Sequence, residues 1–241
     1  MYEYIEVAIK NGTKYFGFSD HAPMDYDLKY RMSLKEKDSY ENDVRNLRKK
    51  YENQIEILLG YEVDYLPKYH EKSVLNADVD YLIGSVHFLD HWGFDNPEFI
   101  REYESRDIDD IWKEYFTQIE FMAKSGLFDI VAHLDLMKVF KFLPQTDIKT
   151  LALNTIKAIK KSNMVVEINS AGYRKPINEA YPSREILELC YEYEVDITFG
   201  SDAHKPNQVG LNSDKMLDFA RSIGYEKCAI FKNRDKELIK F

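Results

Sequence analysis

The chain has 241 residues, of which 33 are basic and 42 acidic, for a formal net charge of −9. This length fits one large domain, which we expect to span residues 1–241, and such a domain needs no disulfide staple. The acidic balance argues against general nucleic-acid binding. It leaves room for a small anionic substrate, because bound metal ions would dominate the charge of a site.

Two further features concern the compartment. No apolar run approaches the length of a membrane span, and no signal-peptide pattern opens the chain. The cysteines, Cys190 and Cys228, belong to no CxxC pair, and we expect both to be reduced thiols. We therefore expect a cytoplasmic protein with no membrane partner, while the sequence indicates no particular oligomeric state.

Amphipathic segments alternate with short β-rich runs, which is typical of parallel strands joined by helices. The chain opens in a helix with Ile5, Ala8 and Ile9 on one face, which Gly12 is placed to end. The expected strands are 15–18, 55–59, 81–86, 129–132, 164–168 and 195–199. Helices are expected over 40–51, 108–122 and 148–161. Another is expected to begin after Ser183, a candidate N-cap, and a last helix is expected before the final β-rich run at 228–231.

Five of the predicted strands end in residues that can bind a metal ion. These residues are His21, Glu62, His87, His133 and the pair Asp202 and His204. In parallel barrels the C-terminal strand ends meet at one mouth, so residues far apart in sequence would meet there. A lone histidine is usually structural, but four at equivalent positions, together with two carboxylates, indicate a shared site.

Electrostatics favours metal ions at such a site. If Glu62 and Asp202 were buried side by side, they would repel each other and one would stay protonated. Divalent cations remove that penalty and hold neutral imidazoles as ligands. Four nitrogens and two carboxylates exceed the needs of one tetrahedral ion and suit two or three ions that share carboxylates. Mixed nitrogen and oxygen ligation allows zinc, manganese or iron.

Six short motifs resemble, in order, those of the PHP (polymerase and histidinol phosphatase) superfamily. They are Ser19-Asp20-His21-Ala22-Pro23, Gly60-Tyr61-Glu62, Ser85-Val86-His87, Ala132-His133-Leu134-Asp135, Glu167-Ile168-Asn169 and Gly200-Ser201-Asp202-Ala203-His204. Their order and spacing are most similar to the monofunctional histidinol-phosphate phosphatases of that superfamily. The resemblance implies a fold of the α/β class, a distorted seven-stranded β/α barrel with a trinuclear metal site.

The resemblance also implies a role for each ligand. Glu62 would bridge, with His87 and His133 beside it on one ion. Asp202 would bind another ion, and His21 with His204 would bind a third. Glu62 and Asp202 are accordingly the catalytic candidates, because they would hold the ions that activate the attacking water.

One family motif is missing. The first strand of the family ends in His-x-His, followed by another metal-binding histidine, and no such residues occur in this chain. We expect the first strand to be absent because the chain is truncated upstream of Met1. The alternative is a weakened relative, in the extreme a metal-binding protein without catalysis.

Three residues are candidates for binding the substrate. Arg174 follows the strand that carries Asn169, on a loop expected to overhang the mouth, where a guanidinium could hold a phosphate at two points. Arg184 is a weaker candidate because it could simply decorate a helix start, and Asn169 could instead support a strand end. Asp20, Asp64 and Asp135 could orient imidazoles, or could be caps and surface charges.

These residues predict a metal-dependent phosphomonoesterase. A hydroxide generated at two metal ions would attack phosphorus in line, with no covalent phospho-enzyme. The resemblance implies L-histidinol phosphate as the substrate, and histidine biosynthesis as the pathway. The alternative is a phosphoesterase of the same superfamily that acts on another ester, such as a nucleotide or a nucleic-acid end.

Overall fold

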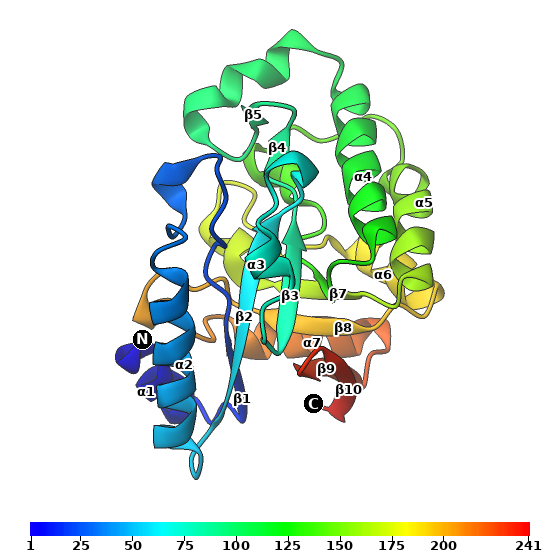
Figure 1. The fold of residues 1–241 in the computed structure, drawn as a ribbon. Helices are drawn as coiled ribbons and strands as arrows, with labels where there is room; N and C mark the ends of the chain where they lie inside the picture. Colours follow the sequence, from blue (N-terminus) through cyan, green and yellow to red (C-terminus); the bar gives the residue numbers. More distant parts are fainter.

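The computed structural model describes residues 1–241, and its centre is a six-stranded parallel sheet curled into an open barrel (Figure 1). The order is β1-β2-β3-β6-β7-β8, with parallel pairing throughout. The strands are β1 Tyr15–Phe18, β2 Glu56–Asp64, β3 Tyr81–Ser85, β6 Ile130–Val131, β7 Val165–Asn169 and β8 Ile197–Gly200. The predicted α/β barrel is therefore confirmed, with six strands and with β1 and β8 as its edges.

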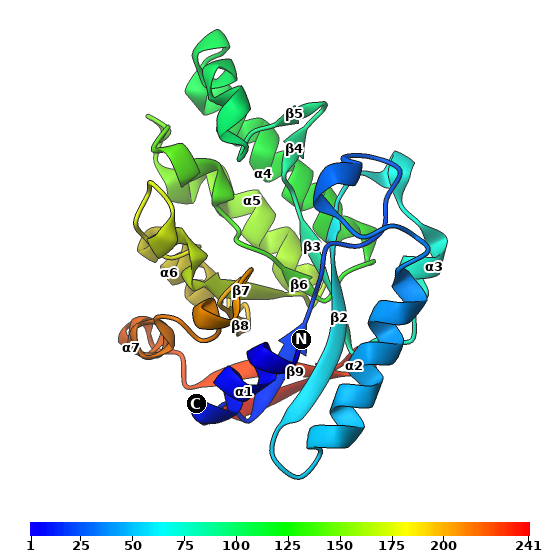
Figure 2. The same ribbon diagram turned by 90° about the vertical axis from the view of Figure 1, so that its left-hand side faces the viewer.

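Helices cover the outside of the sheet (Figures 1 and 2). They are α1 Tyr2–Lys10, α2 Lys37–Tyr51, α3 Lys72–Leu75, α4 Ile108–Ser125, α5 Ile148–Lys161, α6 Arg184–Glu192 and α7 Ser213–Ile223. The longest, α4, is well capped: Asp107 accepts from two main-chain N–H groups, and Gly126 ends the helix at φ 68°. Short 3-10 helices are η1 Leu28–Tyr30, η2 Pro67–Tyr69, η3 Pro97–Ser105, η4 Leu136–Phe140, η5 Ser170–Arg174 and η6 Pro206–Gln208.

Alternation along the strands separates two hydrophobic layers. In β2, Ile57 and Leu59 belong to the large core between the sheet and its helices, whereas Leu58 belongs to a smaller cluster inside the barrel. The ring of Tyr81 fills part of that interior, and it lies so close that a Cβ on Gly17 or Gly60 would collide with it. By the same alternation, Glu62 and Asp64 of β2 share the inner face with Leu58.

A two-stranded antiparallel hairpin closes the end of the barrel where the strands begin. It consists of β9 Lys227–Lys232 and β10 Asp235–Lys240. Ala229 and Phe231 of β9 join the interior cluster. Asp80 accepts from the main-chain N–H of Asn233 at 3.2 Å. The interior is therefore plugged at this end and open at the C-terminal strand ends.

The edge strands β1 and β8 do not pair with each other, so the barrel is open on the side between them. A cavity of about 910 Å³ lies there, lined by residues of both edge strands and by the interior cluster. Helix α1 packs near η6, and Asn11 of the α1–β1 turn donates to the carbonyl of Val209 at 3.1 Å. Figure 2 shows α1 in front of this side. The cavity extends to the C-terminal strand ends, where the candidate ligands lie.

Several details differ from the sequence-based expectations. Strand β2 continues through Asp64, so Glu62 lies within the strand and not after it. The loop after His87 contains a small hairpin, β4 Phe88–Leu89 and β5 Trp92–Gly93. Ser183 occupies the N-cap of α6, but its side chain makes no capping hydrogen bond. The chain ends in β10, a strand not predicted. No helix combines the length and apolar character needed to cross a bilayer.

Candidate metal centre

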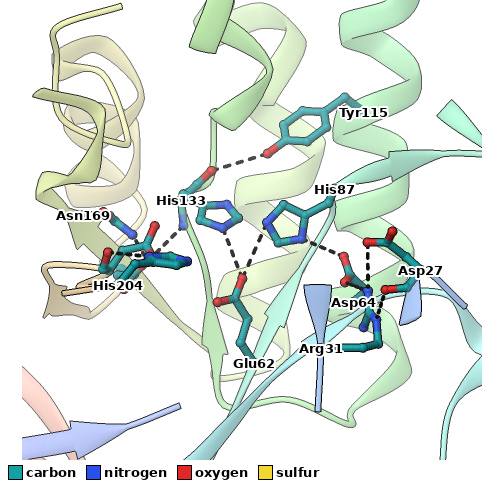
Figure 3. Close-up of polar contacts among 11 residues, drawn as sticks. Asp27, Arg31, Glu62, Asp64, His87, Tyr115, His133, Asn169 and His204 are labelled. Atoms are coloured by element: carbon teal, nitrogen blue, oxygen red, sulfur yellow. Dashed lines mark hydrogen bonds and ion pairs between the residues drawn. The ribbon is translucent and has the colours of Figure 1, made fainter. Parts of the chain in front are cut away.

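Glu62, His87 and His133 converge at the mouth of the barrel (Figure 3). Their strands, β2, β3 and β6, are consecutive neighbours in the sheet. Oε1 of Glu62 lies 3.6 Å from Nε2 of His87 and 3.3 Å from Nε2 of His133. Ligand atoms of all three residues lie within 4.8 Å of one another. We refer to these three residues as the triad.

The triad has the chemistry and spacing of a metal site. Two donors bound at about 2.0–2.1 Å with a tetrahedral angle lie about 3.3 Å apart. The contacts of Glu62 with His87 and His133, at 3.6 and 3.3 Å, match that separation. Two imidazoles and one carboxylate leave a fourth position for water or substrate, as in catalytic zinc sites. These residues therefore fit a divalent metal ion.

Charge in the triad is strongly coupled. Burial alone would raise the pKa of Glu62, but the imidazoles of His21, His133 and His87 together hold it well below its usual range. Burial would lower the pKa of His87, yet the nearby carboxylates, chiefly Asp64, raise it to about 10. In the metal-free protein a protonated imidazole thus faces an ionised carboxylate, and a metal ion would replace that proton.

His87 and His133 are held in place by different means. Nδ1 of His87 donates to Oδ1 of Asp64 at 2.7 Å. Nδ1 of His133 has no partner, and its main chain is held instead. The N–H of His133 donates to Oε2 of Glu167 at 3.1 Å, and its carbonyl accepts from the hydroxyl of Tyr115 at 3.4 Å. This support matters because His133 has a positive φ of 21°, which is unfavourable for a residue with a side chain.

The sequence analysis missed the role of Glu167. Its Oε2 also accepts from Nδ2 of Asn169 at 2.9 Å. Its Oε1 lies 1.8 Å from where a Cβ on Gly200 would be, so any side chain at that position of β8 would displace the Glu167 carboxylate. Burial, with a contribution from nearby Asp202, raises the pKa of Glu167 to about 7. Strand alternation could have found this residue, because Glu167 and Asn169 are two apart and share the inner face.

His21 lies beside the triad on the edge of the sheet. Beyond β1, the chain continues alongside β2, where Ala22 N–H donates to the carbonyl of Glu62 at 2.8 Å. The ring of His21 is 5.7 Å from that of His87, centre to centre, and its Nδ1 is buried without a partner. His21 lines the cavity, and an unpaired buried imidazole nitrogen is consistent with the predicted ligand role.

Asp202 and His204 line the same cavity but do not join the triad. Oδ1 of Asp202 is 3.3 Å from Nδ1 of His204, whose side chain is 68% exposed. The ring of His204 lies 6.5 Å from that of His21. Asp202 has a positive φ of 47°, so its backbone conformation is unfavourable as well. We refer to His21, Asp202 and His204 as the open set.

The three predicted substrate-binding residues have different positions. Asn169 lies at the end of β7 and lines the cavity, where its amide also holds Ala171 N–H at 2.7 Å. Arg174 is not among the residues that line the cavity. Its Nη2 donates to the carbonyls of Ser201 and Asp202 at 2.8 and 2.7 Å, whereas its Nη1 is buried without a partner.

Arg184 is not among the residues that line the cavity. It lies on α6, where it donates to the hydroxyl of Ser222 at 2.8 Å. Its position therefore gives no support to substrate binding. Of the carboxylates predicted to orient imidazoles, Asp64 does so, because it accepts a hydrogen bond from His87. Asp135 instead contacts Lys138 and accepts from the N–H of Ser183.

The fold and the triad define the class of the protein, an α/β barrel with a metal-binding site at its C-terminal strand ends. The chain belongs to the PHP domain family, whose model matches residues 1–171. The predicted membership of the PHP superfamily is therefore confirmed.

Relatives and solved structures extend this match over nearly the whole chain. A protein from Deinococcus radiodurans named probable histidinol-phosphatase is 37% identical over 227 residues, covering 92% of this chain and 86% of the relative. The histidinol-phosphatase of Bacillus subtilis is 26% identical over 247 residues, covering 90% and 91%. The structure of histidinol phosphate phosphatase from Lactococcus lactis, with zinc, L-histidinol and phosphate, is similar in fold with a TM-score of 0.81, at 18% identity, covering 98% and 92%.

Proposed function

We propose that this chain is a metal-dependent phosphomonoesterase that hydrolyses L-histidinol phosphate to L-histidinol and phosphate. The observation that carries the proposal is the triad, Glu62, His87 and His133, assembled at the mouth of the barrel. Relatives that cover most of the chain are named histidinol-phosphatases, which supports the choice of substrate.

The triad would hold one divalent ion, and we propose two or three ions in all, with zinc as the first candidate. Both imidazoles contact the same oxygen of Glu62, so its second oxygen remains available to bind a further ion, and the carboxylate could bridge the two. Asp202, His21 and His204 are the proposed ligands of the further ions. When bound, such ions supply Lewis-acid chemistry, by lowering the pKa of water and drawing charge from phosphoryl oxygens.

The remaining site residues would position the substrate. Asn169 offers an amide at the cavity wall. Nη1 of Arg174 is buried without a partner, and we propose that it turns to bind a phosphate oxygen when the substrate enters, while Nη2 holds the loop of Asp202. Such a contact would strengthen as charge develops on the equatorial oxygens, which is how a guanidinium contributes to phosphoryl transfer.

The test combines metal content with phosphate release. The purified chain is analysed for zinc, manganese and iron, stripped with a chelator, and reloaded with each metal in turn. Phosphate release is then measured on a panel of esters that includes L-histidinol phosphate, a nucleoside monophosphate and an oligonucleotide with a terminal phosphate. Metal-dependent turnover of L-histidinol phosphate above the others is expected. Turnover of a different ester, with none of L-histidinol phosphate, would contradict the proposed substrate.

The position of the open set favours a second candidate, a metal-binding protein without catalysis. His204 is 68% exposed and Asp202 lies outside the triad, so ions beyond the first would have fewer assembled ligands. The same experiment separates the two functions. Binding of one equivalent of zinc without phosphate release from any ester would favour the non-catalytic protein.

A further inference from the structure

Behind His87 lies a line of buried charged groups that leads out of the triad (Figure 3). Asp64, which is 1% exposed, contacts His87 on one side and Arg31 on the other. Arg31 belongs to the 19–36 segment that connects β1 with α2, and its side chain is 2% exposed. We propose that Arg31 is a positioning residue of the metal centre, which acts on His87 through Asp64. This inference rests on the proposed metal site.

The two oxygens of Asp64 have separate partners. Oδ1 accepts from Nδ1 of His87 at 2.7 Å, and Oδ2 accepts from Nη2 of Arg31 at 3.0 Å. The carboxylate therefore cannot rotate without breaking one of these hydrogen bonds. The main chain of Asp64 is also held, because Nε2 of His70 donates to its carbonyl oxygen at 3.0 Å. Asp64 is thus a fixed acceptor on the far side of the His87 ring.

A fixed acceptor decides which nitrogen of His87 can bind a metal ion. Because Nδ1–H is donated to Asp64, the lone pair of the neutral ring belongs to Nε2. Nε2 is the nitrogen that faces Glu62 at 3.6 Å. Carboxylates in this position set both the tautomer and the orientation of metal-binding imidazoles.

Arg31 has the geometry to hold Asp64 in that role. Its Nε donates to the carbonyl of Asp27 at 3.3 Å, and its Nη2 is also 3.7 Å from a carboxylate oxygen of Asp27. The planar guanidinium is thereby fixed through two of its nitrogens, Nε and Nη2, which the single ammonium of a lysine could not reproduce. Arg31 is also the only lysine or arginine in contact with Asp64, so nothing else balances this buried carboxylate from the side away from the triad.

The comparison with His133 makes the proposal specific. Nδ1 of His133 has no partner, and its main chain is held by Glu167 and Tyr115. An effect transmitted through Arg31 and Asp64 should therefore act on His87 directly and reach His133 only through their shared contact with Glu62. General loss of stability would affect both imidazoles alike.

The experiment measures zinc affinity with a chromophoric competitor for the wild type, Arg31→Met, Asp64→Asn and the double variant. Arg31→Met is expected to weaken zinc binding about 10-fold, and Asp64→Asn by about 10- to 100-fold. In the Asp64→Asn background, Arg31→Met should change the affinity less than about twofold, because its route to His87 is already lost. The control is Arg45→Met, which removes an arginine paired with Glu41 at 3.0 Å on α2, and should leave the affinity unchanged.

A second measurement reports on the imidazoles themselves. Nitrogen-15 spectra of the metal-free protein should show the Nδ1–H signature of His87 altered in Arg31→Met, with a smaller change in the signals of His133. Wild-type zinc affinity in Arg31→Met overturns the proposal, and so does an equal loss with and without Asp64. If Arg31→Met does not fold, Arg31→Lys takes its place, with weaker binding expected and wild-type binding overturning the proposal. A wild type that binds no zinc would instead remove the metal centre itself, and this inference with it.

Discussion

Glu62 and His133 of the triad line the same cavity as the open set, but the two groups are built on different parts of the sheet. Glu62 lies on β2, and His87 and His133 follow β3 and β6, so the triad comes from three consecutive strands, whereas the open set follows β1 and β8, the two edges. Neighbouring strands lie about 4.8 Å apart, so ligands at equivalent positions on them meet without further adjustment. The edges β1 and β8 share no ladder, and Asp202 and His204 depend on the loop after β8 for their positions, whereas His21 is bridged to Glu62.

The difference also appears in burial and in support. Side chains of the triad are between 6% and 13% exposed, whereas that of His204 is 68% exposed. His87 is fixed by Asp64, and the main chain of His133 by Glu167. His204 Nδ1 contacts only its neighbour Asp202. We therefore expect the triad to be preformed and the open set to adjust when ions or substrate bind.

The largest expected effect comes from the shared oxygen of the triad. Glu62→Gln removes the negative charge that both imidazoles face, so it should reduce phosphate release by about 1,000-fold or more, a barrier change of about 4 kcal/mol. Zinc content measured by elemental analysis should fall with it. The control is Glu56→Gln on the same strand, which pairs with Lys232 at 2.7 Å far from the mouth and should leave both measurements unchanged.

Replacing one histidine from each group tests the comparison directly. His133→Gln should cost about 100-fold in phosphate release and lower zinc affinity, because it removes a ligand from a preformed site. His204→Gln should cost about 10-fold and leave the tightest zinc site intact, because that side chain is already in solvent. Equal losses of the tightest zinc site in both variants would mean that the two groups form one unit.

Much of this site could be predicted from the sequence because its ligands follow strands. Each of His87 and His133 comes directly after an apolar run, and parallel strands bring such ends to one mouth. The fold class followed from the same alternation of helices and strands. Glu62 was correctly expected at this mouth, although its strand extends two residues beyond it.

The supports of the ligands were harder to predict. Arg31 lies in a segment without regular periodicity, so only the folded chain shows that it meets Asp64, 33 residues later. If Asn169 is taken to face the inside of the barrel, strand alternation predicts that Glu167 faces inward too. Considered alone, however, an acidic residue within a strand is expected to face solvent. Arg184 shows the opposite difficulty, since its residue type suited phosphate binding although its helix faces away from the cavity.

The triad should also couple metal binding to pH. His87, whose pKa is raised to about 10, is protonated at neutral pH in the metal-free protein, and it must lose that proton to bind zinc. Zinc affinity should therefore increase about 10-fold for each pH unit up to about pH 10. Calorimetry in buffers of different ionisation enthalpy measures the released proton. Zinc binding without proton release near neutral pH would show that Asp64 and Glu62 do not hold His87 in its charged form.

The smallest effect on metal binding is expected at Glu167, where charge and geometry can be separated. One oxygen, Oε2, accepts from both His133 and Asn169, and the amide oxygen of a glutamine can do the same. Glu167→Gln should therefore change zinc affinity by less than about threefold. Glu167→Ala is the matched variant, because it removes the acceptor and leaves the positive φ of His133 unsupported, so it should weaken zinc binding about 10-fold or more.

The stability of Glu167→Gln should differ from the wild type in its response to pH. Because the folded protein raises the pKa of Glu167 to about 7, the folded state holds the proton more tightly than the unfolded state. The wild type should thus lose about 3 kcal/mol of unfolding free energy as pH rises from the unfolded pKa through about 7, and glutamine cannot titrate. Urea unfolding of both metal-free proteins at about pH 5 and about pH 8 measures the difference. Parallel pH profiles would mean that Glu167 is already ionised at low pH, and that its charge contributes to holding His133.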